Sequence, residues 1–220
     1  MQRKITSNFE YGFTLAEILI TLVIIGVIAA FTIPTLINNT KKQEYVAGLK
    51  KANSVLSQAL YKMTENNAYP VGDYSYLNES NFIDEFAKVV STVKKCDTFA
   101  ECFDKGQFGY KALGNYTVSI SLGKSVITSD GQMYSFVAPQ NIYGISQEDA
   151  DNTTGRIIVD INGGKNPNQL GYDLFLFYLV KNKGIIPAGS NSTAECDNSS
   201  GSAAGWTCAA RVLKENAMNY

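Results

Sequence analysis

An apolar run near the N-terminus constrains this chain most. It extends from Phe13 to Ile33, 21 residues in which Glu17 is the only charge and no other side chain is strongly polar. A helix of about 20 apolar residues is long enough to cross the hydrocarbon core of a bilayer. Pro34 ends the run. The sequence therefore predicts a membrane-spanning helical segment over residues 13–36.

Glu17 is unusual inside such a segment. A lone carboxylate in a membrane span costs about 2.5–3.5 kcal/mol on insertion scales, and the run contains no Lys, Arg or His to pair with it. Cleavage between Gly12 and Phe13 would create an α-amino group at Phe13, which is largely protonated at neutral pH. In a helix that begins at Phe13, residues 13 and 17 share a face. We therefore expect the new amine to pair with Glu17 of its own chain or of a neighbouring chain.

The stretch Gly12-Phe13-Thr14-Leu15-Ala16-Glu17 follows a short basic leader and precedes the apolar run. This arrangement resembles the prepilin signature of type IV pilins and type II secretion pseudopilins. The resemblance implies a leader at residues 1–12, cleavage after Gly12 by a prepilin peptidase and methylation of the Phe13 amine. It also implies a role for Glu17 in adding subunits to a filament, and a pilin-like globular domain over residues 37–220.

Two simpler interpretations compete with this one. Arg3 and Lys4 are also typical of the basic end of a secretory signal peptide, and an uncleaved signal anchor would have a similar apolar run. Against a signal peptide, the run is longer than a typical apolar core and contains Glu17. Four features coincide only in the prepilin interpretation: the Gly-Phe junction, the carboxylate, the basic leader and the uninterrupted run.

Composition limits the chemistry of the remaining chain. The 220 residues allow one membrane helix and one modest soluble domain. The absence of His excludes Ser-His-Asp triads, Cys-His pairs and His metal ligands. A net charge of −1 argues against nucleic acid as the main partner, because such binding depends on clustered Lys and Arg. We expect a structural protein with no required cofactor, not an enzyme.

Charges beside the span predict its orientation. Arg3 and Lys4 precede the span and favour a cytoplasmic N-terminus, whereas Lys41 and Lys42 follow it and oppose that orientation. We expect a single-pass protein of the cytoplasmic membrane, with its C-terminal domain periplasmic or extracellular.

Apolar periodicity predicts an α+β fold. The spacing from Val46 to Met63 is helical, so the first helix is expected to extend from Phe13 to about Thr64, about 52 residues and about 78 Å. A second helix is expected over residues 82–93, with Asn81 as its N-cap. Asp130-Gly131 predicts a hairpin turn. The strands are expected at residues 116–122, 126–128, 133–137, 157–161 and 174–180. The first helix would pack on this small antiparallel sheet.

Four cysteines lie in the expected soluble domain. In a domain outside the cytoplasm they indicate two disulfides. Of three connectivities we favour Cys96–Cys102 and Cys196–Cys208, because local pairs close the smallest loops without requiring a particular fold. The second pair also resembles the disulfide-bounded C-terminal loop of many type IV pilins. Free buried cysteines are the alternative.

A Gly- and Asn-rich loop from Asp160 to Asp173 is a candidate metal site. Asp160, Asn162 and Asp173 offer the hard oxygen ligands that Ca²⁺ prefers. The loop lacks the terminal Glu of an EF-hand, so it is not an EF-hand loop. It does resemble the calcium-binding loop of major pseudopilins. In the alternative interpretation it is a turn in which Asp160 and Asn162 bond their own backbone.

We therefore expect a pilin or pseudopilin that waits in membrane lipid, is processed after Gly12 and assembles through its apolar helix. Its partners would be the prepilin peptidase, further copies of itself and minor pilins or pseudopilins. A competence (DNA-uptake) or adhesive type IV pilin is the alternative within the family. A membrane-anchored binding or enzymatic domain that uses the 160–173 loop is the alternative from another class.

Overall fold

The computed structural model describes two parts of the chain that divide between Lys41 and Lys42. The residues that it describes are 12–67, 70, 72–102, 110–114, 116–118, 120, 123–192, 196–197, 201 and 204–220. The expected domain boundary between residues 36 and 37 stays a prediction. The expected leader, apart from Gly12, lies outside the described residues.

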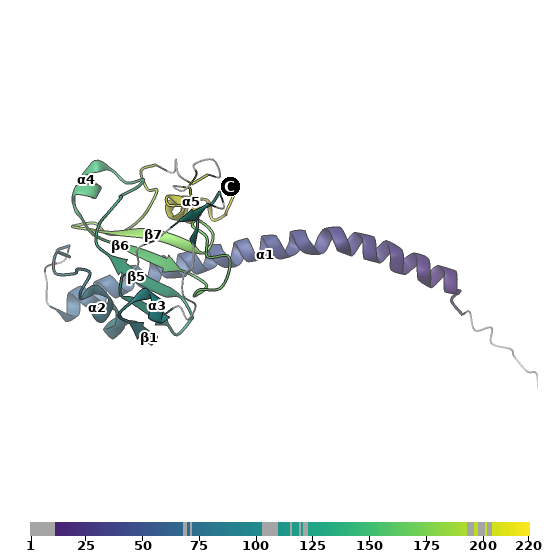
Figure 1. Cartoon of the computed structure of the whole chain (residues 1–220), viewed down its shortest axis with the longest axis horizontal. Coiled ribbons are helices and arrows are strands. Elements are labelled where there is room, and N and C mark those ends of the chain that lie inside the picture. Colours follow the sequence, from purple (N-terminus) through teal and green to yellow (C-terminus); the bar gives the residue numbers. More distant parts are fainter. Residues whose placement is uncertain are drawn as a thin grey trace, which may run out of the picture. The chain divides into compact units, whose positions relative to one another are not determined.

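The long N-terminal helix is α1, Leu15–Asn66, with 52 residues (Figure 1). It begins two residues later than expected, because Thr14 caps it and Phe13 is not helical. Pro34 lies inside α1 and does not end it, although proline cannot donate the backbone hydrogen bond to the Ala30 carbonyl. Length and composition make α1 suitable for crossing a membrane.

A six-stranded antiparallel sheet forms the centre of the second part. Its strand order is β1-β4-β5-β6-β7-β8, so that neighbouring strands follow one another along the chain except β1 and β4, which are separated in sequence by β2 and β3. The strands are β1 Thr92–Cys96, β4 Ser125–Thr128, β5 Met133–Val137, β6 Thr153–Asp160, β7 Leu174–Val180 and β8 Gly184–Pro187. Two short strands, β2 Tyr110–Lys111 and β3 Thr117–Val118, form a separate pair. The expected α+β class with an antiparallel sheet is confirmed.

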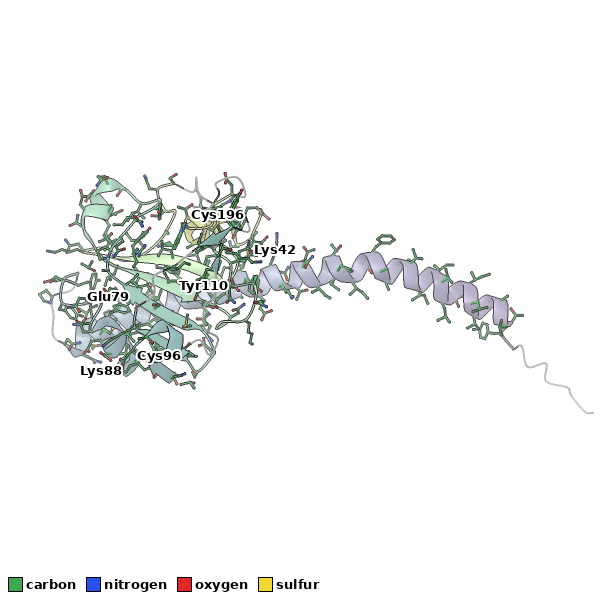
Figure 2. All side chains as sticks on the ribbon, in the orientation of Figure 1. Lys42, Glu79, Lys88, Cys96, Tyr110 and Cys196 are labelled. Carbon is green, nitrogen blue, oxygen red and sulfur yellow. A yellow bond between two sulfur atoms is a disulfide. The ribbon has the colours of Figure 1, made fainter. Side chains whose placement is uncertain are left out.

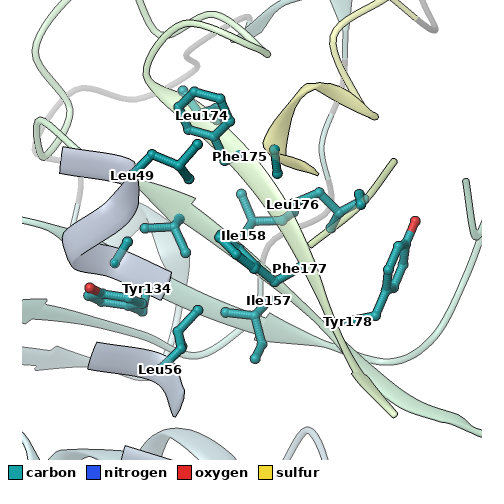
Figure 3. Close-up of a cluster of buried hydrophobic side chains, with 14 of the residues drawn as sticks. Leu49, Leu56, Tyr134, Ile157, Ile158, Leu174, Phe175, Leu176, Phe177 and Tyr178 are labelled. Atoms are coloured by element: carbon teal, nitrogen blue, oxygen red, sulfur yellow. The ribbon is translucent and has the colours of Figure 1, made fainter. Parts of the chain in front are cut away.

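The C-terminal stretch of α1 packs on one face of this sheet. Its buried residues recur at helical spacing, and they include Leu49 and Leu56, which are 0% and 1% exposed. Figure 3 shows these two side chains beside Tyr134, Ile157 and Phe177 of the sheet. Burying such side chains is the main stabilising term in a fold of this size. The buried residues of α1 are Val46, Leu49, Ala52, Leu56, Ala59, Leu60, Met63 and Thr64.

The expected helix over residues 82–93 is too long. The helix α2 is Phe82–Val89, and the chain then enters β1, which pairs with β4. The β-branched residues Val90, Thr92 and Val93 fit a strand as well as a helix, so pairing with β4 decides between them. Asn81 stands at the N-cap position, but its side chain bonds Asn78 and Tyr76 instead of capping α2.

The expected hairpin is present, whereas the strand expected at residues 116–122 is shortened. β4 and β5 pair across the Asp130-Gly131 turn, where Gly131 has a φ of 84°. Within residues 116–122 the strand β3 covers Thr117–Val118 alone, and residues 119, 121 and 122 lie outside the described part. This short segment pairs with Tyr110–Lys111 in a separate two-stranded sheet and not with the strands of the six-stranded sheet.

Three short helices and β8 were not expected. They are α3 Phe99–Cys102, α4 Gln147–Asp151 and α5 Cys208–Glu215. The backbone N–H of Ala210 in α5 donates to the Ala188 carbonyl, at 3.0 Å, so α5 lies against the segment that follows β8. By composition the stretch from Gly189 to Gly205 would be flexible, and α5 begins after it.

Candidate functional site

The first candidate site is the backbone around Gly12 and Phe13. Both residues are exposed and precede α1 in non-helical conformation. Nothing lies within 4 Å of the position that a Cβ would occupy at Gly12. The junction predicted for cleavage is therefore accessible and outside the helix, although cleavage there stays a prediction.

Thr14 and Glu17 form a reciprocal cap at the start of α1. The backbone N–H and the hydroxyl of Thr14 both donate to Glu17 Oε2, at 2.8 Å, and the Glu17 N–H donates to Thr14 Oγ1, at 3.2 Å. This is a capping box, which satisfies N–H groups that the first turn of a helix leaves unpaired. Such groups are costly to leave unpaired in lipid.

The capping box changes the geometry expected for Glu17. Phe13 precedes the helix, so residues 13 and 17 do not share a helical face in this structure as expected. Sequence reasoning missed Thr14, although the Thr-x-x-Glu spacing is a recognised signal for a helix start. The Phe13 backbone nitrogen is nevertheless one residue from the Thr14 nitrogen that contacts the carboxylate.

The 160–173 loop brings the two predicted carboxylates together. Asp160 ends β6 and Asp173 precedes β7, and Asn162 joins them: its N–H donates to Asp160 Oδ1 and its Nδ2 donates to Asp173 Oδ2, both at 3.0 Å. Both carboxylates are 0% exposed. Burial and then the charge of Asp173 raise the pKa of Asp160 to about 7, and burial raises the pKa of Asp173 to about 6.

Backbone N–H groups hold both carboxylates. Asp160 accepts from Gly163 and Gly164, each at 2.8 Å. Asp173 accepts from Asn168 and Gln169, at 2.8 and 2.6 Å. The loop therefore has the local bonding of the turn interpretation, because Asp160 and Asn162 bond nearby backbone and side-chain groups.

Two amide oxygens in this loop fit a hard cation as well. Asn162 Oδ1 and Asn168 Oδ1 are buried and accept no hydrogen bond. Buried polar atoms of this kind are rare in native proteins and require an explanation. Across the described residues no three His, Cys, Asp or Glu side chains cluster to hold a metal. Calcium here would thus depend on amide and backbone oxygens beside Asp160 and Asp173, a donor set that it accepts.

Both predicted disulfides are present. Cys96 bonds Cys102, with a Cα–Cα distance of 5.6 Å, and Cys196 bonds Cys208, with 4.8 Å. Figure 2 labels one cysteine of each pair, Cys96 in β1 and Cys196 near α5. The second bond ties Cys196 to Cys208, the first residue of α5.

These features define a class of protein: an α+β domain whose long N-terminal helix starts with an apolar stretch behind a Gly-Phe junction. A family model described as the prokaryotic N-terminal methylation motif matches residues 8–33. The N-terminal segment of the chain thus carries the sequence pattern of this methylation motif.

Two curated proteins are similar to part of the chain. The type II secretion system core protein G of Pectobacterium carotovorum is 40% identical over 64 residues, which are 28% of this chain and 39% of that protein. The protein of the same name from Vibrio cholerae is 35% identical over 67 residues, 29% of this chain and 44% of that protein. The chain therefore spans less than half the length of each relative. No solved structure matches it with significance.

Proposed function

We propose that this chain is a structural subunit of a type II secretion or type IV pilus-like filament. It is processed after Gly12 and assembles through the apolar stretch of α1. One observation carries the proposal: the exposed, non-helical Gly12-Phe13 junction stands directly before an apolar helix that has Glu17 in its first turn. The methylation motif over residues 8–33 and the type II secretion relatives support it.

Location and partners follow from this proposal. The subunit waits in the lipid of the cytoplasmic membrane with its N-terminus cytoplasmic and its globular part on the other side, where disulfides persist. The prepilin peptidase processes it, and copies of the same chain with minor pilins or pseudopilins complete the filament. Its role is structural and requires no cofactor and no nucleic acid.

Intact-mass and N-terminal peptide spectrometry of protein from cells with an active prepilin peptidase tests the proposal. The expected N-terminus is Phe13 with one added methyl group. A bulky residue in place of Gly12 should leave the leader attached, because the peptidase must approach this backbone closely. An intact leader on the unaltered chain would contradict the proposal.

Deletion of the gene that encodes this chain distinguishes the alternatives within the family. Loss of protein secretion supports a pseudopilin, whereas loss of DNA uptake or of adhesion supports the corresponding type IV pilin. A membrane-anchored binding domain would be unprocessed and would form no filament.

We further propose that the 160–173 loop binds calcium, because two buried carboxylates and two orphaned amide oxygens lie in one loop. Asp160, Asp173, Asn162 and Asn168 would hold the ion. It would neutralise the two adjacent buried charges and order a loop rich in Gly and Asn. A ligand that binds only the folded state stabilises it by mass action.

Thermal unfolding of the full chain in detergent, with and without calcium, tests this second proposal. Calcium should raise the melting temperature, and the gain should vanish in Asp160→Asn and Asp173→Asn, which keep the shape of the side chain. Asp149→Asn is the matched control, since Asp149 bonds Lys183 instead. Magnesium should substitute poorly because it requires tighter octahedral geometry. Identical unfolding curves with and without millimolar calcium would show that the loop is a turn that does not bind the ion.

A further inference from the structure

Arg156 is a buried cation whose charge no described residue neutralises. It lies in β6 with 6% of its surface exposed. Its Nε is buried without a hydrogen-bond partner, and its guanidinium forms no ion pair or hydrogen bond with any described residue. Removing an arginine from water without a partner is costly, so a native structure rarely keeps one without a reason.

The position of Arg156 in the sheet explains what surrounds it. In the register it is opposite Val137 of β5 and Tyr178 of β7, so the three side chains share one face. The Tyr178 hydroxyl donates to the Tyr143 carbonyl and accepts from the Tyr143 N–H, at 3.2 and 2.7 Å. Tyr143 in turn stacks on Trp206, with ring centroids 6.0 Å apart. The neighbourhood is thus aromatic.

Two of the acidic residues close to Arg156 in sequence are already bound elsewhere. Asp149 in α4 pairs with Lys183, at 2.5 Å, and Asp151 accepts a hydrogen bond from Gln147, at 2.8 Å. Burial lowers the pKa of Arg156, and the nearby tyrosines Tyr178 and Tyr143 only partly oppose that change. Among the described residues Arg156 is therefore a guanidinium without a bound anion, held in a fixed place by β6.

The terminal nitrogens of Arg156 are the groups that a ligand can reach. Nε is the nitrogen of this side chain that is both fully buried and unpaired, so the 6% of Arg156 that stays exposed lies on its other atoms. A guanidinium presents such groups in a planar fork that matches a carboxylate with two parallel hydrogen bonds. Flanking aromatic rings exclude water and strengthen a charge pair of this kind.

We infer that Arg156 is a binding site for a carboxylate that another molecule supplies, and that in the assembled filament an acidic side chain of a second copy of this chain supplies it. The second half of this inference depends on the proposed function. A carboxylate at this place would neutralise the buried charge without rearranging the sheet. The chain carries 20 Asp and Glu residues from which a second copy can present one.

A titration of the full chain in detergent tests the site itself, with glutarate as the probe and uncharged glutaramide as its control. Glutarate should shift the Nε–H resonance of Arg156 in a saturable way. At about five times its Kd it should raise the melting temperature by about 2–4 °C. Glutaramide should do neither. Equal effects of the two compounds on the unaltered chain would overturn the site.

Variants locate the response. Arg156→Met should lose the gain from glutarate and, without glutarate, should melt at or above the temperature of the unaltered chain, because a buried unpaired charge is gone. Arg156→Lys should keep a smaller gain. Lys181→Met, which removes a basic side chain at an exposed position, should keep the whole gain. A full gain in Arg156→Met, or in Arg156→Lys where the Met variant does not fold, would contradict the assignment.

Sedimentation of the full chain at increasing concentration identifies the source of the carboxylate. Weaker self-association of Arg156→Met than of Lys181→Met supports a second copy as the source. Equal association, with the glutarate response intact, assigns the carboxylate to a different molecule. A chain that is never processed would still respond to glutarate, so failure of the proposed function and failure of this site are distinguishable.

Discussion

The two stretches of α1 on either side of the Lys41–Lys42 division are helical for different reasons. From Leu15 to Lys41 no side chain is buried, and Ile24 is 53% exposed although it is apolar. From Lys42 to Asn66 the apolar residues form one buried stripe, and the remaining positions are mostly polar and exposed. Continuous apolarity specifies the first stretch, and a period of about 3.6 residues specifies the second.

This difference indicates where each stretch obtains its stability. The second stretch is stabilised by the sheet of its own chain, so changes in its stripe act on folding. The first stretch has no such cover among the described residues of its part, so changes there act on insertion into lipid or on assembly. The predictions below test this division, from the largest expected effect to the smallest.

The largest effect is expected from the charge of Glu17. Glu17→Val should leave membrane insertion intact or improved, because a charge leaves the span, and filament formation should be lost because the Phe13 amine loses its partner. Membrane fractionation and electron microscopy of filaments measure the two properties. Filaments at normal yield would show that the carboxylate is not needed.

Glu17→Gln separates the charge from the helix cap. Gln can still close a capping box with Thr14, but it carries no charge. We expect Glu17→Gln to fail in assembly like the Val variant. Assembly at normal yield in the Gln variant would assign the role of this residue to the cap.

The second prediction compares equivalent changes in the two stretches. Leu56→Ala should lower the free energy of unfolding of the globular part by about 2–5 kcal/mol, because it leaves a cavity in a packed core. Leu22→Ala, at a residue that is 61% exposed, should leave that free energy unchanged. Denaturant unfolding of the two full-length variants in detergent measures the difference. Similar losses would mean that the first stretch also contributes to the folded core.

The third prediction concerns the disulfide far from α1 in sequence. Replacing Cys196 and Cys208 by Ser should cost about 3 kcal/mol of stability, and the same change at Cys96 and Cys102 should cost about 2 kcal/mol because the closed loop is shorter. Thermal unfolding under non-reducing conditions measures both. Insertion of the apolar stretch should be unaffected, and poor insertion of either variant would speak against the division.

The smallest effect is expected at the start of α1. Thr14→Val removes the hydroxyl that donates to Glu17 Oε2 and accepts from the Glu17 N–H, but it keeps the backbone N–H at residue 14. It should cost about 1 kcal/mol of local helix stability, with no change in the melting temperature of the globular part. Faster hydrogen exchange of the amides at residues 14–17 measures the loss. Thr14→Ser keeps the hydroxyl and should exchange as the unaltered chain does.

Much of the fold was predictable where one local pattern dominates. Only one structural interpretation fits each of three patterns: the apolar run, the stripe from Val46 to Met63 and the Asp130-Gly131 hairpin. Residues 90–93 allow two interpretations, because β-branched side chains suit both helix and strand. The pairing of β1 with β4 decided between them. The helix α5 was not expected, because its eight residues are too few to show a clear helical period.

The candidate sites divide in the same way. The Gly12-Phe13 junction and Glu17 follow from adjacent residues, and the two cysteine pairs follow from short loops. Arg156 could not be singled out, because an arginine in a strand is ordinary until its neighbours are known.

The sequence by itself determined the apolar span, its carboxylate, the cysteine pairs and the helical period, because these depend on residues within a few positions of one another. Only the tertiary structure decided that backbone N–H groups hold Asp160 and Asp173 and that two amide oxygens beside them have no partner. It alone also placed Arg156 between Val137 and Tyr178, with no anion bound to it in the part of the chain that is described. The physical reason is that the burial and pairing of a charged side chain depend on strands distant in sequence. The sequence around the residue shows neither.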